Sequence, residues 1–238
     1  IPTINKNFSP CGNFSIPGVS GTGSKIELNY LNPGGSSTGK ILPTGNVIET
    51  LKVPKVGNFE VSIIDASAAT VFIDSKTLNL TCEESIEELE QNKNLLTTLE
   101  KIRQAASVQM GLTSVLGTAP LGTPKICIVS NSSKFKTLAG CLIHKDDANL
   151  FTRYVSMGQI HRALPLTGAM CIAIASQIKG TICNNLSTAT SGKIKISNPS
   201  GVLPVTANVT ARGNKWLAHD VTVYRTARTL MSGKVFIP

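Results

Sequence analysis

Aromatic and charged residues are scarce in this 238-residue chain. It contains one Trp, three Tyr and seven Phe, and charged residues make up 16% of it. The 23 Lys and Arg residues are scattered, and no basic run is interleaved with aromatic side chains as in proteins that bind single strands. We therefore expect no nucleic-acid partner. The net charge of +9 is still compatible with a small anionic substrate.

Long apolar runs are also absent. The longest mostly apolar stretch, from Leu164 to Ile178, is shorter than a bilayer span and is interrupted by Thr167 and Ser176. We therefore expect no membrane partner. The first residue is Ile1 and no signal-peptide pattern follows it, so we interpret the start as a truncation.

Closely paired cysteines are missing too. No C-x-x-C pair occurs and no His stands at metal-ligand spacing, which argues against a zinc site, and we expect no metal. Irregular spacing in a chain long enough to bury a core favours reduced, mostly buried thiols over a disulfide framework, and we therefore expect a cytoplasmic protein. The six cysteines stand at positions 11, 82, 127, 141, 171 and 183.

Alternating apolar and polar residues are present toward both ends of the chain. After a Gly/Pro/Ser/Asn-rich loop over 1–23, this alternation predicts strands, and hence an antiparallel β meander. Towards the C-terminus the same pattern returns, with Asn-Pro-Ser-Gly at 198–201 as a turn. The expected strands cover 25–30, 47–53, 58–65, 69–73, 193–196, 202–209 and 216–224.

The middle of the chain has helical signals. Acidic residues after Thr81 and basic residues at Lys101 and Arg103 predict one or two helices over about 83–110, ended by Gly111. A buried strand is expected at 126–129.

Two more helices are expected further on, one from Asp146 through about Met157 and one from Thr167 to near Gly180. Strands first, helices in the middle and strands last indicate an α+β fold with mainly antiparallel sheet.

The start of the last expected helix is the first candidate site. Pro165, Thr167 and Gly168 precede a small-residue run that begins with Ala169. Such a start exposes backbone N–H groups and the positive end of the helix dipole, which suits a carboxylate. The alternative is a Thr-capped core helix that binds nothing.

Cys171 would lie in the first turn of that helix. There the same N–H groups could lower the pKa of its thiol enough for proton transfer. Alternatively, Cys171 is a small buried residue that packs beside Ala173 and Ala175.

Further candidate residues stand in loops. Thr44, Gly45 and Asn46 offer a hydroxyl, backbone donors and an amide for a carboxylate, or form a simple tight turn. Asp65 stands at the end of an apolar strand and is either a site carboxylate or a helix cap or turn anchor.

His161 stands between the pair Met157 and Gly158 and the candidate helix start. It could orient or protonate a ligand, and we include all three residues among the candidate ligand contacts. A lone His is more often structural.

Short motifs stand in a fixed order along the chain. They are IPGVSGTG at 16–23, LPTGNV at 42–47, IIDA at 63–66, AASVQMGL at 105–112, TPKI at 123–126, SMG at 156–158, HRA at 161–163, TGAMC at 167–171, GT at 180–181 and RTARTLMSG at 225–233. Single motifs are weak signals, but the ordered set spans the chain and resembles the PrpF-type family of the diaminopimelate-epimerase-like superfamily.

The resemblance implies a fold and an activity. Members are similar to 2-methylaconitate cis-trans isomerase, methylitaconate isomerase and oxalomesaconate tautomerase, which move a proton on small unsaturated polycarboxylic acids without a cofactor. Each has two similar domains, with a sheet curled around a central helix. Residues 1–24 would end the first domain, 25–217 would form the second, and 218–238 would return to the first.

One domain would then be largely complete and the other mostly missing. The expected partners are a small unsaturated polycarboxylate and either a second copy in a homodimer or a complementing first-domain chain. In the epimerases the catalytic Cys directly precedes a Gly-Thr-Gly turn, whereas here Pro165 and Leu166 occupy that region and Cys171 comes later. The competing hypothesis is a non-catalytic truncated paralogue that retains carboxylate binding or no function.

Overall fold

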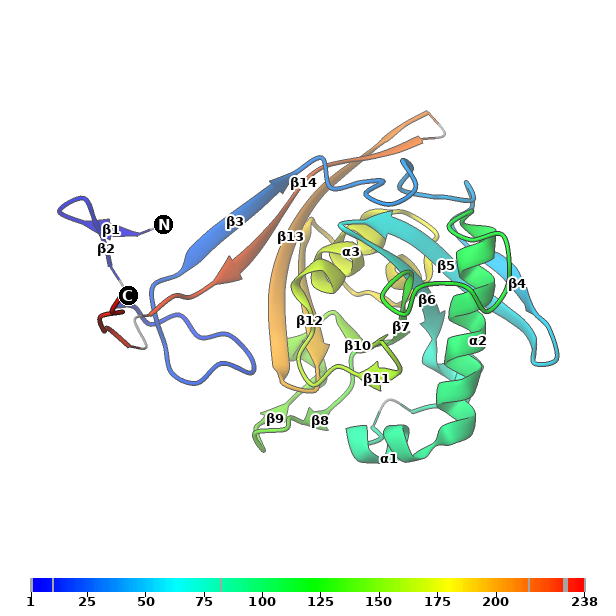
Figure 1. Ribbon diagram of the computed structural model, residues 1–238, viewed down its shortest axis with the longest axis horizontal. Coiled ribbons are helices and arrows are strands. Elements are labelled where there is room, and N and C mark those ends of the chain that lie inside the picture. The colour runs from blue at the N-terminus through cyan, green and yellow to red at the C-terminus, as the bar shows by residue number, and fades with distance from the viewer. Residues whose placement is uncertain (1, 10, 82, 214, 229–230, 238) are drawn as a thin grey trace.

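The computed structural model is built around one large mixed sheet (Figure 1) and describes residues 2–9, 11–81, 83–213, 215–228 and 231–237. Cys82 and the residues at 229 and 230 of the last motif lie outside the described residues. In spatial order the sheet contains β3 (Ile26–Leu31), β14 (Lys215–Arg225), β13 (Gly201–Arg212), β12 (Lys193–Asn198), β10 (Leu150–Ser156), β7 (Lys125–Ser130), β6 (Ala68–Asp74), β5 (Gly57–Ala66) and β4 (Glu49–Val53), and β11 (Gln159–Ile160) pairs with β10.

Most neighbouring strands in this sheet are antiparallel. The two parallel pairs are β10 with β12 and β6 with β7, and both belong to the middle of the sheet. Hairpins join β5 to β6, β12 to β13 and β13 to β14, as the alternating sequence predicts. The expected α+β class with a mainly antiparallel sheet is confirmed.

Two hydrophobic clusters cover opposite faces of the central strands. In β5, Ile64 belongs to the cluster around α3 (Leu166–Gln177), whereas its neighbour Ile63 belongs to the cluster around α1 (Ile86–Gln91) and α2 (Lys93–Gln109). Successive side chains of a strand point to opposite faces, so a strand covered on both sides needs apolar residues at consecutive positions. This explains the unbroken apolar run in β7.

The helix α3 is the centre of the fold. It contacts β5 and β6 from one half of the sheet and β12, β13 and β14 from the other, so the sheet curls around it (Figure 1). Every residue from Gly168 to Ser176 is buried. A helix that is apolar and small on all sides is suited to such a position, since it has no face to present to water. The short helix α4 (Ile182–Leu186) follows and packs on α3.

The expected helices over 83–110 are confirmed as α1 and α2. Ser85 caps α1 in a reciprocal capping box with Glu88, because the Ser85 hydroxyl accepts from the Glu88 amide and the Glu88 carboxylate accepts from the Ser85 amide. Asn92 ends α1 and caps α2 through a hydrogen bond from the amide of Leu95. The change of direction between the two helices is therefore encoded locally.

The helix expected from Asp146 to Met157 is wrong. Asp146 and Asp147 lie in a single 3-10 turn, Lys145–Asp147, and the chain then enters β10 (Leu150–Ser156). The carboxylate of Asp147 accepts from the backbone of His144 at 2.8 Å, which closes the turn rather than opening a helix. All seven residues of β10 are buried between β7 and β12, so burial on both faces overrides the local signal of the acidic pair.

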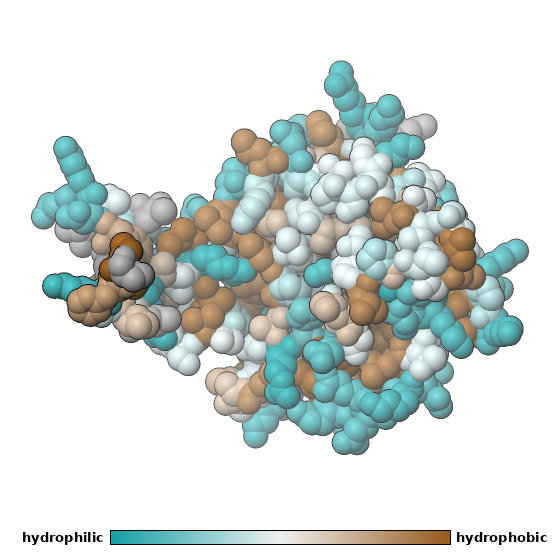
Figure 2. Space-filling model, in the orientation of Figure 1, coloured by the Kyte–Doolittle hydropathy of each residue, from teal (hydrophilic) through white to brown (hydrophobic). Residues whose placement is uncertain are grey.

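At one edge of the sheet, β3 and the outer part of β14 extend away from the body as an arm (Figure 1). The arm is followed outward by the hairpin of β1 (Thr3–Ile4) and β2 (Asn7–Phe8). Figure 2 shows apolar side chains along this arm and mostly hydrophilic ones over α1. A second small hairpin, β8 (Phe135–Lys136) with β9 (Leu142–Ile143), lies apart from the main sheet.

No helix in the described ranges is long and apolar enough to cross a membrane. The expected division of the chain into residues 1–24, 25–217 and 218–238 stays a prediction. The strand β14 runs from Lys215 to Arg225, across the expected boundary at 217, and pairs with β13 and β3 over this length.

Candidate functional site

The helix α3 starts without a side-chain cap. Pro165 is the N-cap residue and makes no side-chain hydrogen bond to the first turn, and Thr167 is the second residue of the helix rather than its cap. The first main-chain bond of the helix runs from the amide of Ala169 to the carbonyl of Pro165 at 2.9 Å. The preceding amides of Leu166, Thr167 and Gly168 therefore have no partner inside the helix, and the positive end of the dipole is concentrated there.

Gly168 packs directly against the ring of Tyr154 in β10. A Cβ atom added to Gly168 would lie 2.7 Å from two carbons of that ring. The Tyr154 hydroxyl forms a 2.9 Å hydrogen bond with the hydroxyl of Thr70 in β6. Burial raises the pKa of Tyr154 well above its ordinary value, so the phenol stays protonated. Its ring packs beside the start of the helix and is held there by the hydrogen bond to Thr70.

His161 also contacts Tyr154. The two rings are arranged edge to face with their centroids 5.9 Å apart, and the amide of His161 donates to the carbonyl of Tyr154 at 2.8 Å. Partial burial, and after it the positive charge of Lys125, lowers the pKa of His161. The imidazole is therefore neutral at pH 7, and the positive charge beside it belongs to Lys125.

Met157 and Gly158 form the tip of the hairpin between β10 and β11. Both have left-handed backbone angles, with φ of 55° and 75°, as a tight hairpin turn requires. Met157 is 66% exposed. The turn fixes the register that brings His161 opposite Tyr154, but the side chain of Met157 points to solvent.

Cys171 is fully buried in the middle of the molecule. Its Sγ atom lies 3.8 Å from the carbonyl oxygen of Ile64 in β5. Burial raises the pKa of the Cys171 thiol to about 12, the opposite direction to the lowering that a first-turn position would produce. The reason is positional: α3 begins at Leu166, so Cys171 lies past the turn with free amides. The geometry matches the packing alternative.

Asp65 is a turn anchor. Its carboxylate accepts a hydrogen bond from the hydroxyl of Ser36 at 2.8 Å and from the amide of Ser37 at 2.8 Å. It also accepts from the amide and hydroxyl of Thr38, at 2.6 and 2.9 Å. These four bonds hold the loop over 36–38 against the end of β5, and they use the acceptor sites of the carboxylate within the protein.

The loop with Thr44, Gly45 and Asn46 lies at the other end of α3. The hydroxyl of Thr44 donates to Glu49 at 2.5 Å, and the amide of Gly45 donates to Leu42 at 3.1 Å, which closes a tight turn. Directly after this turn, Val47 contacts Gly180, which follows the C-terminal end of the helix. A 12-residue helix is about 18 Å long, so this loop and the start of α3 do not form one site.

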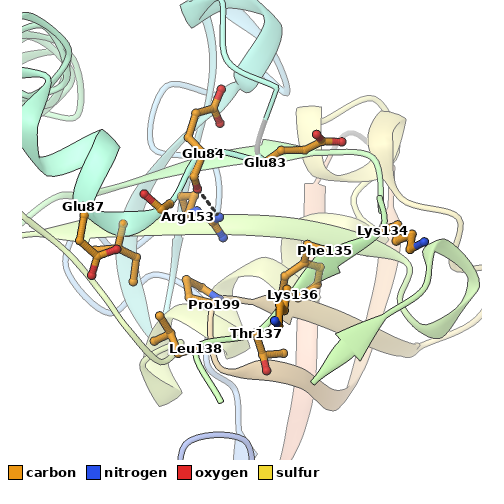
Figure 3. Close-up of a pocket in the computed structure, with 12 residues that line it drawn as sticks. Glu83, Glu84, Glu87, Lys134, Phe135, Lys136, Thr137, Leu138, Arg153 and Pro199 are labelled. Carbon is orange, nitrogen blue, oxygen red and sulfur yellow. Dashed lines mark hydrogen bonds between the residues drawn. The ribbon is translucent and has the colours of Figure 1, made fainter. Parts of the chain in front are cut away.

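A separate cavity of about 340 Å³ lies on the opposite face of the sheet, between the segment before α1 and β8 (Figure 3). The guanidinium of Arg153 stacks 4.4 Å from the ring centroid of Phe151 and donates to the carbonyl of Glu84 at 2.9 Å. Acidic Glu83 and Glu87 and basic side chains from the β8 segment share its rim. These contacts fasten the segment before α1 to the sheet.

The structure therefore brings together His161, Thr167, Gly168 and Ala169, and it adds Tyr154, Thr70 and Lys125, which were not predicted as site residues. Lys125 had a signal, because it stands in the TPKI motif at 123–126. Tyr154 was not predicted as a site residue, because the segment that contains it was expected to be a helix. Within the described ranges, no cluster of three or more His, Cys, Asp or Glu residues could hold a metal ion.

Comparison with known proteins shows which relatives share this chain's sequence. It is 29% identical to the 2-methyl-aconitate isomerase of Shewanella oneidensis, over 100% of this chain and 62% of the relative. It is 32% identical to the 3-methylitaconate isomerase of Eubacterium barkeri, over 95% of this chain and 60% of the relative. The chain thus spans about 60% of the length of these curated relatives.

The fold is shared as well. A crystal structure of methylitaconate-delta-isomerase superposes with a TM-score of 0.87 at 30% identity, and the match covers 98% of this chain and 60% of that one. The family model described as PrpF protein matches residues 1–238. Sequence, fold and motif order agree, and the chain belongs to the PrpF protein family.

Proposed function

We propose that this chain is the carboxylate-binding portion of a cofactor-independent isomerase with a diaminopimelate-epimerase-like fold. The proposed reaction is a proton shift or cis-trans isomerisation on a small unsaturated di- or tricarboxylic acid. Relatives named as isomerases of methylaconitate and methylitaconate support the substrate class. The observation that carries the proposal is the start of α3, where amides without a partner inside the helix lie beside Tyr154 and near a neutral His161, whose pKa is lowered in part by the charge of Lys125.

The chemistry requires two things from the protein. Removal of a proton from the carbon acid requires a base, and the negative charge that spreads into the carboxylates requires fixed positive potential. The amides at the start of α3 are suited to the second task, because the contact of Gly168 with Tyr154 holds them in place, and we propose that the positive charge of Lys125 adds to their potential. We assign His161 to orienting the bound acid.

We place the proton-transfer step outside this cluster. The Tyr154 phenol in the cluster has a pKa raised well above its ordinary value, and the Cys171 thiol, buried deeper in the molecule, has a pKa of about 12, so neither supplies a usable base near pH 7. The neutral imidazole of His161 is assigned here to orienting the acid and not to removing its proton. Because the chain spans about 60% of its relatives, we propose that the base comes from the portion it does not match. A complementing chain or a longer form of this protein would supply it.

The test is turnover with and without that portion. The chain is assayed alone and co-expressed with the unmatched part of the Shewanella oneidensis relative, using 2-methylaconitate in deuterated water and NMR detection. We expect deuterium incorporation and isomerised product only in the co-expressed assembly, and a reduced rate when Lys125→Met is introduced there. A Lys52→Met variant on β4 is the matched control and should leave the rate unchanged.

Each other outcome has a defined meaning. Turnover by the chain alone would contradict the assignment of the base to another portion. An assembly that forms and binds the acid but never exchanges a proton would favour the non-catalytic alternative.

A further inference from the structure

A small cavity lies directly before the start of α3. Its volume is about 180 Å³, and three segments that are distant in sequence form its wall. They are the segment around Gly18, the residues Ala163 and Leu164 that lead to Pro165, and the β12–β13 turn with Asn198. The last described residue of β14, Arg225, closes it.

Hydrogen bonds and close contacts hold these segments together, so the walls of the cavity are fixed relative to one another. The hydroxyl of Ser200 donates to the carbonyl of Arg162 at 2.7 Å, which ties the turn to the segment before α3. Gly18 has a φ of 81°, and a Cβ atom added to it would lie 3.4 Å from both Ala163 and Ser200. In Figure 1 the loop between β2 and β3 correspondingly passes beside the start of β13.

Among the residues that the structure describes, Arg225 is the cationic side chain that lines this cavity. Its Nη1 donates to the carbonyl of Tyr224 at 3.1 Å. No carboxylate of the described residues forms an ion pair with it, and Glu27 on the neighbouring strand pairs with Lys25 at 3.0 Å instead. Partial burial lowers the pKa of Arg225, although the group remains charged at pH 7, so a partly desolvated charge lines the cavity without a counter-ion among the described residues.

We infer that Arg225 is a substrate-anchoring residue, whose guanidinium holds one carboxylate of a small polycarboxylic acid in this cavity. A guanidinium offers two parallel N–H donors that match the two oxygens of a carboxylate. The cavity is too small for a large ligand but accommodates one end of a small acid. A second carboxylate of the same molecule then faces the free amides at the start of α3.

The inference rests on the proposed function for the class of ligand. The two are nevertheless separable, because anchoring is a property of binding and needs no turnover. A saturated tricarboxylate, tricarballylate, has no double bond to shift and is therefore a probe of anchoring alone.

The experiment measures tricarballylate binding to the 238-residue chain by calorimetry and by amide chemical shifts. We expect binding with shift changes at Gly18 and Leu164, and a loss of affinity on the order of 10- to 100-fold in Arg225→Met. Arg212→Met, an exposed arginine at the end of β13, is the matched control and should change the affinity by less than about twofold. Arg225→Lys keeps the stem and the charge, and should lose about tenfold because it cannot bind bidentately.

Three results would overturn the inference: no binding by the unaltered chain, unchanged affinity in both Arg225 variants, or an equal loss in Arg212→Met. If Arg225→Met does not fold, Arg225→Lys decides alone. Turnover in the co-expressed assembly together with unchanged binding in both Arg225 variants would leave the proposed function standing and remove only this residue.

Discussion

At the scale of single residues, the site depends on which groups carry charge. His161 is half-buried against Tyr154 and feels the charge of Lys125, and both effects favour the neutral imidazole. Cys171 and Tyr154 keep their protons because burial penalises the anion. The charge that acts on His161 therefore belongs to Lys125, and the positive potential at the start of α3 comes from the backbone amides of its first turn.

We predict that the pKa of His161 in the folded protein lies below 6.5, and that Lys125→Met raises it part of the way back, because burial is the larger cause. An NMR titration of the imidazole protons measures this. The exposed Lys52→Met, in β4 at the far edge of the sheet, should leave the value unchanged. An unaltered His161 pKa in Lys125→Met would contradict the charge placement.

The same lowered pKa has a consequence for stability. In the unfolded chain His161 titrates near 6.5, so between that value and the lower folded pKa the unfolded state binds more protons. The free energy of unfolding should therefore fall as the pH falls through this window. His161→Gln should remove this part of the pH dependence, as measured by denaturant unfolding at several pH values.

Single residues also show where reasoning from sequence stops. The positions of Thr167, Gly168 and His161 near one another could be predicted, because they are close in the chain and belong to ordered motifs. The role of Asp65 as an anchor for the loop over 36–38 could be named only as an alternative. What decides the role of Asp65 is a set of four hydrogen bonds to residues about 30 positions earlier in the chain. The alternation of residue types does not encode these bonds.

At the scale of elements, strands and helices with their own local signals were predictable. Helices α1 and α2 have caps and charge order in the sequence, and the hairpins have turn residues. The strand β10 was not predicted from the sequence, because the acidic pair before it resembles a helix start and its own seven residues are buried on both faces. Tertiary pairing with β7 and β12 decides its state.

The contact between α3 and β10 gives a prediction at this scale. Gly→Ala inside a helix ordinarily stabilises a protein by up to about 1 kcal/mol. We predict the opposite sign for Gly168→Ala, a loss of about 1–3 kcal/mol, because the new methyl group would overlap the ring of Tyr154. Denaturant unfolding monitored by circular dichroism measures the difference.

Gly122→Ala is the matched control for this change. Gly122 has open space around its Cβ position and no left-handed backbone angle, so its replacement should change the free energy of unfolding by less than about 0.5 kcal/mol. Equal effects of the two substitutions would mean that Tyr154 can move aside, and that the start of α3 is less rigid than the proposed carboxylate site requires.

At the scale of the whole molecule, the central helix and the arm differ in how far the rest of the protein covers them. The helix α3 is enclosed by the curled sheet, whereas β3 is the terminal strand of that sheet in the described part of the chain and has one partner, β14. Leu31 at its end is 70% exposed and Tyr30 is 38% exposed. An unpaired strand edge with exposed apolar side chains favours association with another chain.

We predict that the isolated chain self-associates through this arm. In sedimentation velocity, its mass should rise above the 25.1 kDa of one chain at concentrations on the order of 10–100 µM. Leu31→Glu should weaken the association about tenfold, because a carboxylate would have to be buried in the contact. Leu142→Glu, at a 49% exposed leucine on the separate β8–β9 hairpin, is the control and should have no effect.

A monomer at all concentrations, or equal loss in both variants, would show that the arm is not the contact. If the co-expressed portion of the proposed assembly binds the same edge, it should also suppress self-association of the unaltered chain, since one strand edge accepts one partner at a time.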